Sequence, residues 1–388
     1  GTGDLNVVWG DGNIDVNPQF VKVITTGDEE SDYHLSDWSP AIGAGTATGA
    51  PTTDIEGNPR PNPAGSNPDM GAFENKNSTQ QNRKIYISVN GDSTANGTST
   101  YPLESIQRGI DMSIDGDTVS VSAGTYKENI DFIGKNISVI GADRETTIID
   151  GGMDTTFNDA SGAVVFNSGE TSAALLDGFT IQNGTSFRGG GLTITASPTI
   201  ENLIIKNNSA LAGGGVHIQT GDPIFNNVDF LNNVSTVDYD GYSLGSRGGA
   251  LLVAAGSQSI FTNCTFAGNQ SGGYGGGVYV ETATPDFIHV NFYGNNSTSA
   301  GDGLVLSAGS TVDVTNSIFW SNNLEQILFQ SDGDANSLTV AYSNIQGGQD
   351  SIVTNNNGTV TWGAGNIDVN PMFVDTANGN YHLKDWYE

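Results

Sequence analysis

The chain has 388 residues, of which 43 are acidic and 13 are basic, so its formal net charge is −30 with histidine neutral. A surface this acidic repels nucleic acids and anionic membranes, which excludes both as expected partners. The 53 glycines lack the strict period of collagen, the single cysteine excludes an internal disulfide, and no apolar run is long enough to predict a membrane span.

Residues 1–74 are predicted to be a closing segment, because part of their sequence returns at the end of the chain. Residues 9–21 read WGDGNIDVNPQFV, and residues 362–374 read WGAGNIDVNPMFV. The motif YHLxDW follows both stretches, at residues 33–38 and 381–386. The longer first copy resembles the closing segment of secreted bacterial β-helix proteins of the choice-of-anchor type, in which this segment follows the last coil.

The order is permuted in this chain, since the closing segment stands ahead of a new solenoid. Residues 1–74 either close a preceding repeat unit in a tandem array or cover the C-terminal end of a neighbouring molecule. A duplication in which both copies fold within one molecule is the third interpretation. Residues 360–388 are predicted to be a truncated second copy of the closing segment.

Residues 75–113 are predicted to be a linker followed by a short capping helix. Residues 75–83 are polar and lack an apolar period, whereas Leu103, Ile106 and Ile110 fall on one face of a helix. A helix at this place would cover the open end of a solenoid, which otherwise exposes both its core and a strand edge.

A β-helix is predicted over residues 114–359 from a repeat that sets one apolar residue in each coil in register. This column comprises Ile181, Ile205, Phe230, Phe266, Phe292, Phe319 and Ile345. Its steps are 24 to 27 residues, with one step of 36. A second inward column lies five positions earlier, from Leu176 to Val340, so strands of period two are interrupted by a bend. A glycine-rich triplet opens most coils, as at residues 189–191.

The bend carries a column of asparagines with one histidine. It comprises Asn202, Asn227, Asn263, His289 and Asn316. Asparagine tolerates left-handed backbone better than other non-glycine residues, and its amide hydrogen-bonds to neighbours. The sequence therefore predicts a structural ladder at this bend, and a second asparagine column six residues later marks the next turn.

These coils resemble known families. The alternation of GGA or GGG triplets with F-x-x-N turns over residues 178–346 resembles the coils of bacterial polymorphic outer-membrane proteins and autotransporter adhesins. Residues 114–130 resemble the opening coil of pectin-lyase-like proteins. The resemblance implies an all-β fold, a right-handed parallel β-helix solenoid with a short N-terminal capping helix and partial terminal repeat segments. It also implies a secreted or cell-surface location in a bacterium.

Two pairs of outward side chains are candidates for a site, because each pair is expected to lie on consecutive coils. Asp177 and Glu201 would be about 4.8 Å apart by strand spacing, which favours a shared proton or a bound Ca²⁺. They are also the weak catalytic candidates, although such a pair arises by chance in so acidic a chain. Tyr293 and Trp320 could stack on sugar rings, although isolated surface aromatics are common.

The step of 36 residues inserts a loop at residues 235–247. Binding residues often gather on long loops that a rigid scaffold supports. The alternative is a surface loop without a binding role. Its candidates for ligand or partner binding are Asp238, Tyr239, Asp240, Tyr242 and Arg247.

Two further side chains are placed by the same register. His217 is expected to point outward between Thr193 and Leu252, with no acid or nucleophile beside it, which leaves a catalytic triad unsupported. Cys264 is expected to point inward as a buried structural thiol.

Together the patterns favour an extracellular structural or adhesive β-helix protein without catalysis, as one unit of a tandem array or an end-to-end fibre. Its expected partners are further copies of itself or neighbouring repeat units, and cell-surface or matrix glycans. No cofactor is expected, with calcium as the one candidate ion.

The alternative is a polysaccharide lyase or glycoside hydrolase that acts on a glycan along the β-helix face. The chain lacks the N-T-D, D-D, H-G and R-x-K motifs of the related hydrolases and the R-x-P-x-x-R pattern of the lyases. Its acidic surface would also repel polyuronates.

Overall fold

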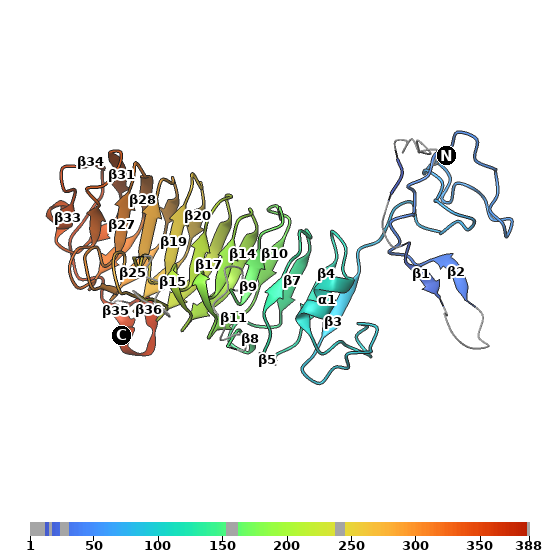
Figure 1. The fold of residues 1–388 in the computed structure, drawn as a ribbon, viewed down its shortest axis with the longest axis horizontal. Coiled ribbons are helices and arrows are strands. Elements are labelled where there is room, and N and C mark those ends of the chain that lie inside the picture. The colour runs from blue at the N-terminus through green and yellow to red at the C-terminus, as the bar shows by residue number, and fades with distance from the viewer. Residues whose placement is uncertain (1–11, 15–17, 24–30, 153–161, 237–244, 386–388) are drawn as a thin grey trace, which may run out of the picture. The chain divides into compact units, whose positions relative to one another are not determined.

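The computed structural model describes residues 12–14, 18–23, 31–152, 162–236 and 245–385 (Figure 1). The chain divides into two compact units, Gly1–Arg83 and Lys84–Glu388. No helix in the described part of the chain is both long and apolar enough to cross a membrane.

The second unit is a parallel β-helix, which confirms the predicted all-β solenoid. The described strands of the solenoid form three parallel sheets, here called sheets I, II and III. Sheet I contains β3 (Lys84–Ile87), β4 (Thr118–Val121), β5 (Gly124–Tyr126), β7 (Ser138–Gly141), β8 (Thr147–Asp150), β10 (Leu175–Asp177), β11 (Thr180–Gln182), β14 (Thr199–Lys206), β17 (Ile224–Leu231), β20 (Ile260–Thr262), β21 (Thr265–Ala267), β24 (Asp286–Ile288), β25 (Asn291–Tyr293), β28 (Thr311–Thr315), β29 (Ile318–Trp320), β31 (Asn336–Ala341), β32 (Asn344–Ile345) and β34 (Gly358–Trp362).

Sheets II and III are smaller. Sheet II contains β12 (Thr185–Arg188), β15 (Ser209–Ala212), β18 (Val234–Ser235), β22 (Gln270–Ser271) and β26 (Asn296–Ser297). Sheet III contains β6 (Ile130–Asp131), β9 (Val164–Phe166), β13 (Leu192–Ile194), β16 (Val216–Ile218), β19 (Leu251–Ala254), β23 (Val278–Glu281), β27 (Leu304–Ser307), β30 (Ile327–Phe329) and β33 (Ile352–Val353). The chain runs from sheet I through sheet II to sheet III in each complete coil.

The register predicted for the two inward columns is confirmed. Ile181 pairs with Ile205, and the same column continues coil by coil to Ile345. The column that begins at Leu176 likewise continues to Val340. Phenylalanines in these columns stack on the next coil, as Phe230 does on Phe266 with 4.4 Å between ring centroids. The strand spacing therefore matches the spacing of stacked rings in the core.

The bend in sheet I has the predicted left-handed backbone, but its side chains form only short runs of bonds. The φ angle is +50° at Asn202 and +56° at Asn227, Asn263 and His289. Asn227 Nδ2 donates to Asn202 Oδ1 at 2.7 Å, whereas Asn263 Nδ2 donates instead to Asn226 Oδ1 at 3.2 Å. These side chains lie at the surface, so water competes for their bonds.

The continuous ladder occupies the second asparagine column, between sheets I and II. It comprises the buried residues Asn208, Asn233, Asn269, Asn295 and Asn322. Asn269 Nδ2, for example, donates to Phe230 O and to Asn295 Oδ1, both at 2.9 Å. The ladder forms here because the turn is buried and leaves backbone carbonyls of the preceding coil in need of donors.

Helix α1 (Ile106–Met112) caps the first coil, as predicted, with Ile106 and Ile110 buried in the core. Glu128 accepts from Ile106 N at 2.8 Å and from Ser105 Oγ at 2.7 Å, so it closes the start of the helix. Strand β3 precedes the helix and pairs with β4, so sheet I begins within the range predicted to be linker and capping helix.

The end of the second unit is the antiparallel hairpin of β35 (Phe373–Asp375) and β36 (Asn380–Leu383), coloured red in Figure 1. The short 3-10 helices η1 (Gly348–Ser351) and η2 (Thr376–Asn378) lie in the same region of the sequence. The hairpin contacts sheet I, because the rings of Phe373 and Tyr381 both pack against Tyr293 of β25.

In the described part of the first unit, β1 (Phe20–Lys22) and β2 (Asp32–Leu35) form a hairpin that is followed by turns. Its small core comprises Leu35, Ala41 and Ile42, with Met70 packed against them. A buried ion pair joins Arg60 Nε to Glu74 Oε2 at 2.7 Å and holds the later turns together.

Candidate functional site

A groove follows the solenoid where the ends of the sheet II strands lie beside the outward face of sheet III. The glycine triplets allow this arrangement, since a Cβ at Gly214 would clash with Gly249 O and with the backbone of Val234. Thr193 Oγ1 of β13 donates to the carbonyl of Arg188 at 2.8 Å, which shows how closely the end of β12 approaches sheet III. The chain thus turns back on itself within each coil.

A layer of buried apolar side chains lies beneath this groove. These outward residues form a second hydrophobic cluster, separate from the main core, which comprises Ala212, Leu252, Tyr279, Val305 and Leu328. Three hollows lie along the groove among the described residues, with volumes of about 290, 200 and 490 Å³. The first two share Arg188, His217 and Gln219, and the third continues past Tyr274 and Leu328. The groove therefore extends over several consecutive coils.

His217 has an unsatisfied polar atom in this groove. The residue is 3% exposed, lines the first two hollows, and its Nδ1 has no hydrogen-bond partner. Burial, and to a smaller extent the positive charge of Arg188, lowers the pKa of His217 to about 3. The imidazole is therefore neutral near pH 7, and a buried polar atom without a partner costs roughly 1–3 kcal/mol.

Charged and aromatic side chains link the coils further along. Arg247 Nη1 donates to Glu281 Oε1 at 2.6 Å, and the guanidinium lies 5.2 Å from the centre of the Tyr279 ring. Tyr279 OH donates to Gln330 Oε1 at 2.8 Å, and burial raises the pKa of Tyr279 to about 12. Arg188 is exposed and makes no ion pair with the described residues. Among its described residues the groove thus offers Arg188, a cation without an ion pair, and a neutral imidazole, above a buried tyrosine.

Of the predicted insertion residues, Arg247 lies in this groove. Asp238, Tyr239, Asp240 and Tyr242 lie outside the described residues.

Asp177 and Glu201 are neighbours on consecutive coils, as the register predicts, but they lie on sheet I. Asn202 Nδ2 donates to Asp177 Oδ1 at 2.7 Å. In the described part of the chain, no three His, Cys, Asp or Glu side chains gather to hold a metal ion. The calcium site stays a prediction that rests on two carboxylates.

A second acidic pair escaped the sequence analysis. Asp286 and Asp313 pair across neighbouring strands of sheet I. Burial, and then the charge of Asp313, raises the pKa of Asp286. Asp286 and Asp313 stand one residue before the inward residues Phe287 and Val314. Comparing outward positions between consecutive coils, as for Asp177 and Glu201, would therefore have predicted this pair as well.

Tyr293 and Trp320 are also neighbours, as predicted. Tyr293, however, is engaged by the C-terminal hairpin, since its OH donates to Thr376 Oγ1 at 3.2 Å and its ring lies 5.5 Å from that of Phe373. The surface predicted to stack on sugars is therefore partly covered by the protein itself.

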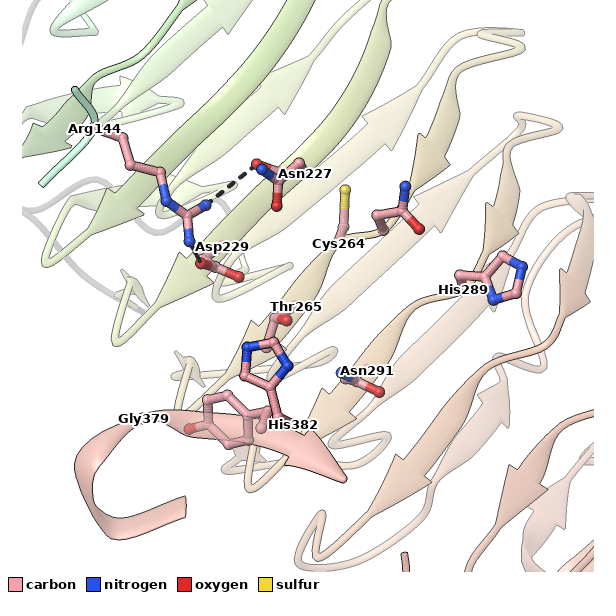
Figure 2. Close-up of a pocket in the computed structure, with 11 residues that line it drawn as sticks. Arg144, Asn227, Asp229, Cys264, Thr265, His289, Asn291, Gly379 and His382 are labelled. Carbon is pink, nitrogen blue, oxygen red and sulfur yellow. Dashed lines mark hydrogen bonds and ion pairs between the residues drawn. The ribbon is translucent and has the colours of Figure 1, made fainter. Parts of the chain in front are cut away.

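A polar hollow of about 340 Å³ remains between this hairpin and sheet I (Figure 2). Arg144 Nη2 lies 2.9 Å from Asp229 Oδ2 at its edge, and His289 and His382 also line it. Cys264 is buried in an inward column, as expected, and burial raises its pKa to about 12, which suits a structural thiol. Arg144 and Asp229 are already paired with each other, so this hollow is a weaker candidate for a binding site than the groove is.

Sequence reasoning missed most of the groove. The missed residues that line its hollows include Tyr274 and Glu281, and His217 was placed outward without a role. A signal was present, because the strands of sheet III read LLV, VYV, LVL and ILF without alternation. Such continuous apolar runs indicate strands that are buried on both faces.

No family model matches the chain, and no curated protein matches it. Similar solved structures include the pectate lyase Pel9A, with 18% identity and a TM-score of 0.46 over 77% of this chain and 84% of that one. A rhamnogalacturonan lyase has 14% identity and a TM-score of 0.36, over 78% and 95%. A pectin methylesterase from carrot has 14% identity and a TM-score of 0.35, over 74% and 82%. These likenesses are likenesses of fold.

Proposed function

We propose that this protein is an extracellular, adhesive β-helix protein that binds a glycan chain along the groove between sheets II and III. The observation that carries the proposal is the buried, unpartnered Nδ1 of His217 in the hollow beside Arg188. A neutral imidazole nitrogen either donates or accepts, depending on its tautomer, and a sugar hydroxyl serves as its partner in both cases.

The shape and the lining of the groove support an extended ligand of this kind. Tyr274 and Leu328, which line the third hollow, suit the faces of sugar rings, whereas Arg188 suits a hydroxyl or an acidic substituent. Hollows that continue from coil to coil suit a polymer. The acidic, glycine-rich composition supports a secreted or cell-surface location.

Binding is tested with a glycan array of neutral and uronate-containing oligosaccharides, followed by calorimetric titration of the best ligand. His217→Leu should weaken binding about tenfold, because it removes one hydrogen bond worth roughly 1.4 kcal/mol. Arg188→Gln should weaken binding of uronate-containing ligands more than binding of neutral ones.

The matched control is His289→Asn, an exposed histidine on sheet I where neighbouring coils carry asparagine. It should bind like the wild type. Equal affinities for His217→Leu and the wild type, or an array without binding, would contradict the proposal.

Cleavage of the bound glycan is the second candidate, because the groove also contains carboxylates. Hydrolysis of glycosides generally uses two carboxyl groups on opposite sides of the bond, and Glu281 of the groove is hydrogen-bonded to Arg247. We expect no new reducing ends and no unsaturated product when the bound glycans are incubated with the protein. Product formation that Glu281→Gln abolishes would replace adhesion with catalysis.

A further inference from the structure

The two copies of the long repeat form the same hairpin in the two units. Phe20 pairs with Leu35 in the first copy, and the equivalent Phe373 pairs with Leu383 in the second. The aromatic rings also meet in the same way, since Phe20 and Tyr33 lie 5.5 Å apart at 87°, and Phe373 and Tyr381 lie 5.9 Å apart at 88°. Each hairpin thus has an aromatic face, here defined by its Phe and Tyr rings, and a leucine.

In the second copy the aromatic face is covered by the solenoid. Tyr293 contacts both rings, at 5.5 Å from Phe373 and 5.4 Å from Tyr381. Its OH donates to Thr376 Oγ1 in the turn of the hairpin. Burial raises the pKa of Tyr381, as expected of a phenol that has lost part of its water contact.

In the first copy the described residues of the same face are exposed within their own unit. Phe20 is 37% exposed, Tyr33 is 52% exposed, and Val21 between them in sequence is 55% exposed. The leucines show the reverse pattern, because Leu35 is 7% exposed under Ala41 and Ile42, whereas Leu383 is 56% exposed. Each copy therefore buries the part of the hairpin that the other copy leaves bare.

We propose that the aromatic face of the N-terminal hairpin binds the Tyr293 surface of a second copy of this chain, in the place of that copy's own C-terminal hairpin. The two hairpins share the Phe and Tyr whose rings make the contact, although Val23 stands where the second copy has Thr376, so the surface that accepts the rings of one accepts those of the other. Lys22 stands where the second copy has Asp375, which brings a cation to a partner whose net charge is −30. The proposal uses residues outside the groove and stands whether or not a glycan binds there.

The resident C-terminal hairpin competes for the same surface. Because it is tethered to the solenoid, its effective concentration is high, and the wild-type chain associates weakly. Weakening the resident hairpin should therefore strengthen association between copies. A purely structural role of the C-terminal hairpin would make no such prediction.

Sedimentation velocity of the full chain over a wide concentration range tests this. Phe373→Ala with Tyr381→Ala should make copies associate at least about tenfold more tightly than the wild type, which corresponds to about 1.4 kcal/mol. Adding Phe20→Ala and Tyr33→Ala to that variant should return it to monomers. Adding Tyr293→Ala instead should do the same, because the accepting surface is lost.

Ile55→Ala, at an exposed apolar residue of the first unit, is the control and should leave association unchanged. Far-ultraviolet circular dichroism checks that each variant keeps the solenoid. Two results would overturn the proposal: a Phe373→Ala/Tyr381→Ala variant that remains monomeric at all concentrations, and association that persists without Phe20 and Tyr33.

Discussion

His217 shows how a single residue couples the groove to the stability of the fold. A histidine in the unfolded chain has a pKa near 6.5, whereas burial lowers the pKa of His217 to about 3 in the folded protein. Between these values the unfolded state binds more protons, so the free energy of unfolding falls as the pH is lowered. The stability that depends on neutral His217 is present above about pH 6.5 and is lost towards pH 3.

We expect His217→Gln to lose less stability than the wild type on acidification. The difference in the free energy of unfolding between neutral pH and moderately acidic pH should reach a few kcal/mol, measured by urea unfolding at each pH. Parallel curves for His217→Gln and the wild type would show that His217 takes up its proton without unfolding.

At the scale of the structural element, the glycine triplets decide whether the groove exists. Gly214 lies between sheets II and III, where a Cβ would meet backbone atoms of the next coil. Backbone atoms in a stacked coil cannot move aside without breaking parallel strand pairs on both sides. A side chain at this position therefore pushes neighbouring coils apart.

Gly214→Ala should destabilise the solenoid by about 3 kcal/mol or more, or prevent folding, measured by thermal unfolding. Gly294→Asn is the matched control, because Gly294 has a φ of +62° with no atom near its missing Cβ. The equivalent positions in other coils already carry Asn207 and Asn232 with the same left-handed backbone. A near-neutral Gly214→Ala variant would mean that the turns between sheets II and III are looser than the structure indicates.

For the whole molecule, the charge of −30 is the dominant long-range term. The folded chain confines 43 acidic and 13 basic side chains, so repulsion destabilises it relative to the expanded unfolded state. Ion pairs such as Arg60 with Glu74 and Arg144 with Asp229 offset only part of this repulsion. Screening of the charges by salt should therefore stabilise the protein.

We expect the midpoint of thermal unfolding to rise by several degrees between low and physiological ionic strength, to the same extent in sodium and potassium chloride. A falling midpoint would mean that favourable ion pairs outweigh the repulsion. Calcium chloride at equal ionic strength tests the predicted calcium site. An additional rise that Asp177→Asn with Glu201→Gln removes would support that site, and equal midpoints would leave it without support.

The coil register, the inward columns, the buried cysteine and the capping helix followed from the sequence. Each depends on a local pattern that recurs once per coil, and burial of the same side-chain column in successive coils leaves only one register possible. Phe230, Phe266 and Phe292 illustrate this, because a slip by one residue would turn all three outward.

The groove, and the packing of the C-terminal hairpin on Tyr293, depend on the tertiary structure. Whether an outward side chain is exposed depends on what other segments pack against it, and such contacts have no period in the sequence. His217 and Tyr279 are outward residues that become buried because sheet II folds back over them. The sequence by itself determined which side of each strand faces the core, whereas the folded chain decided which part of the outer surface remains open to a ligand or a second copy.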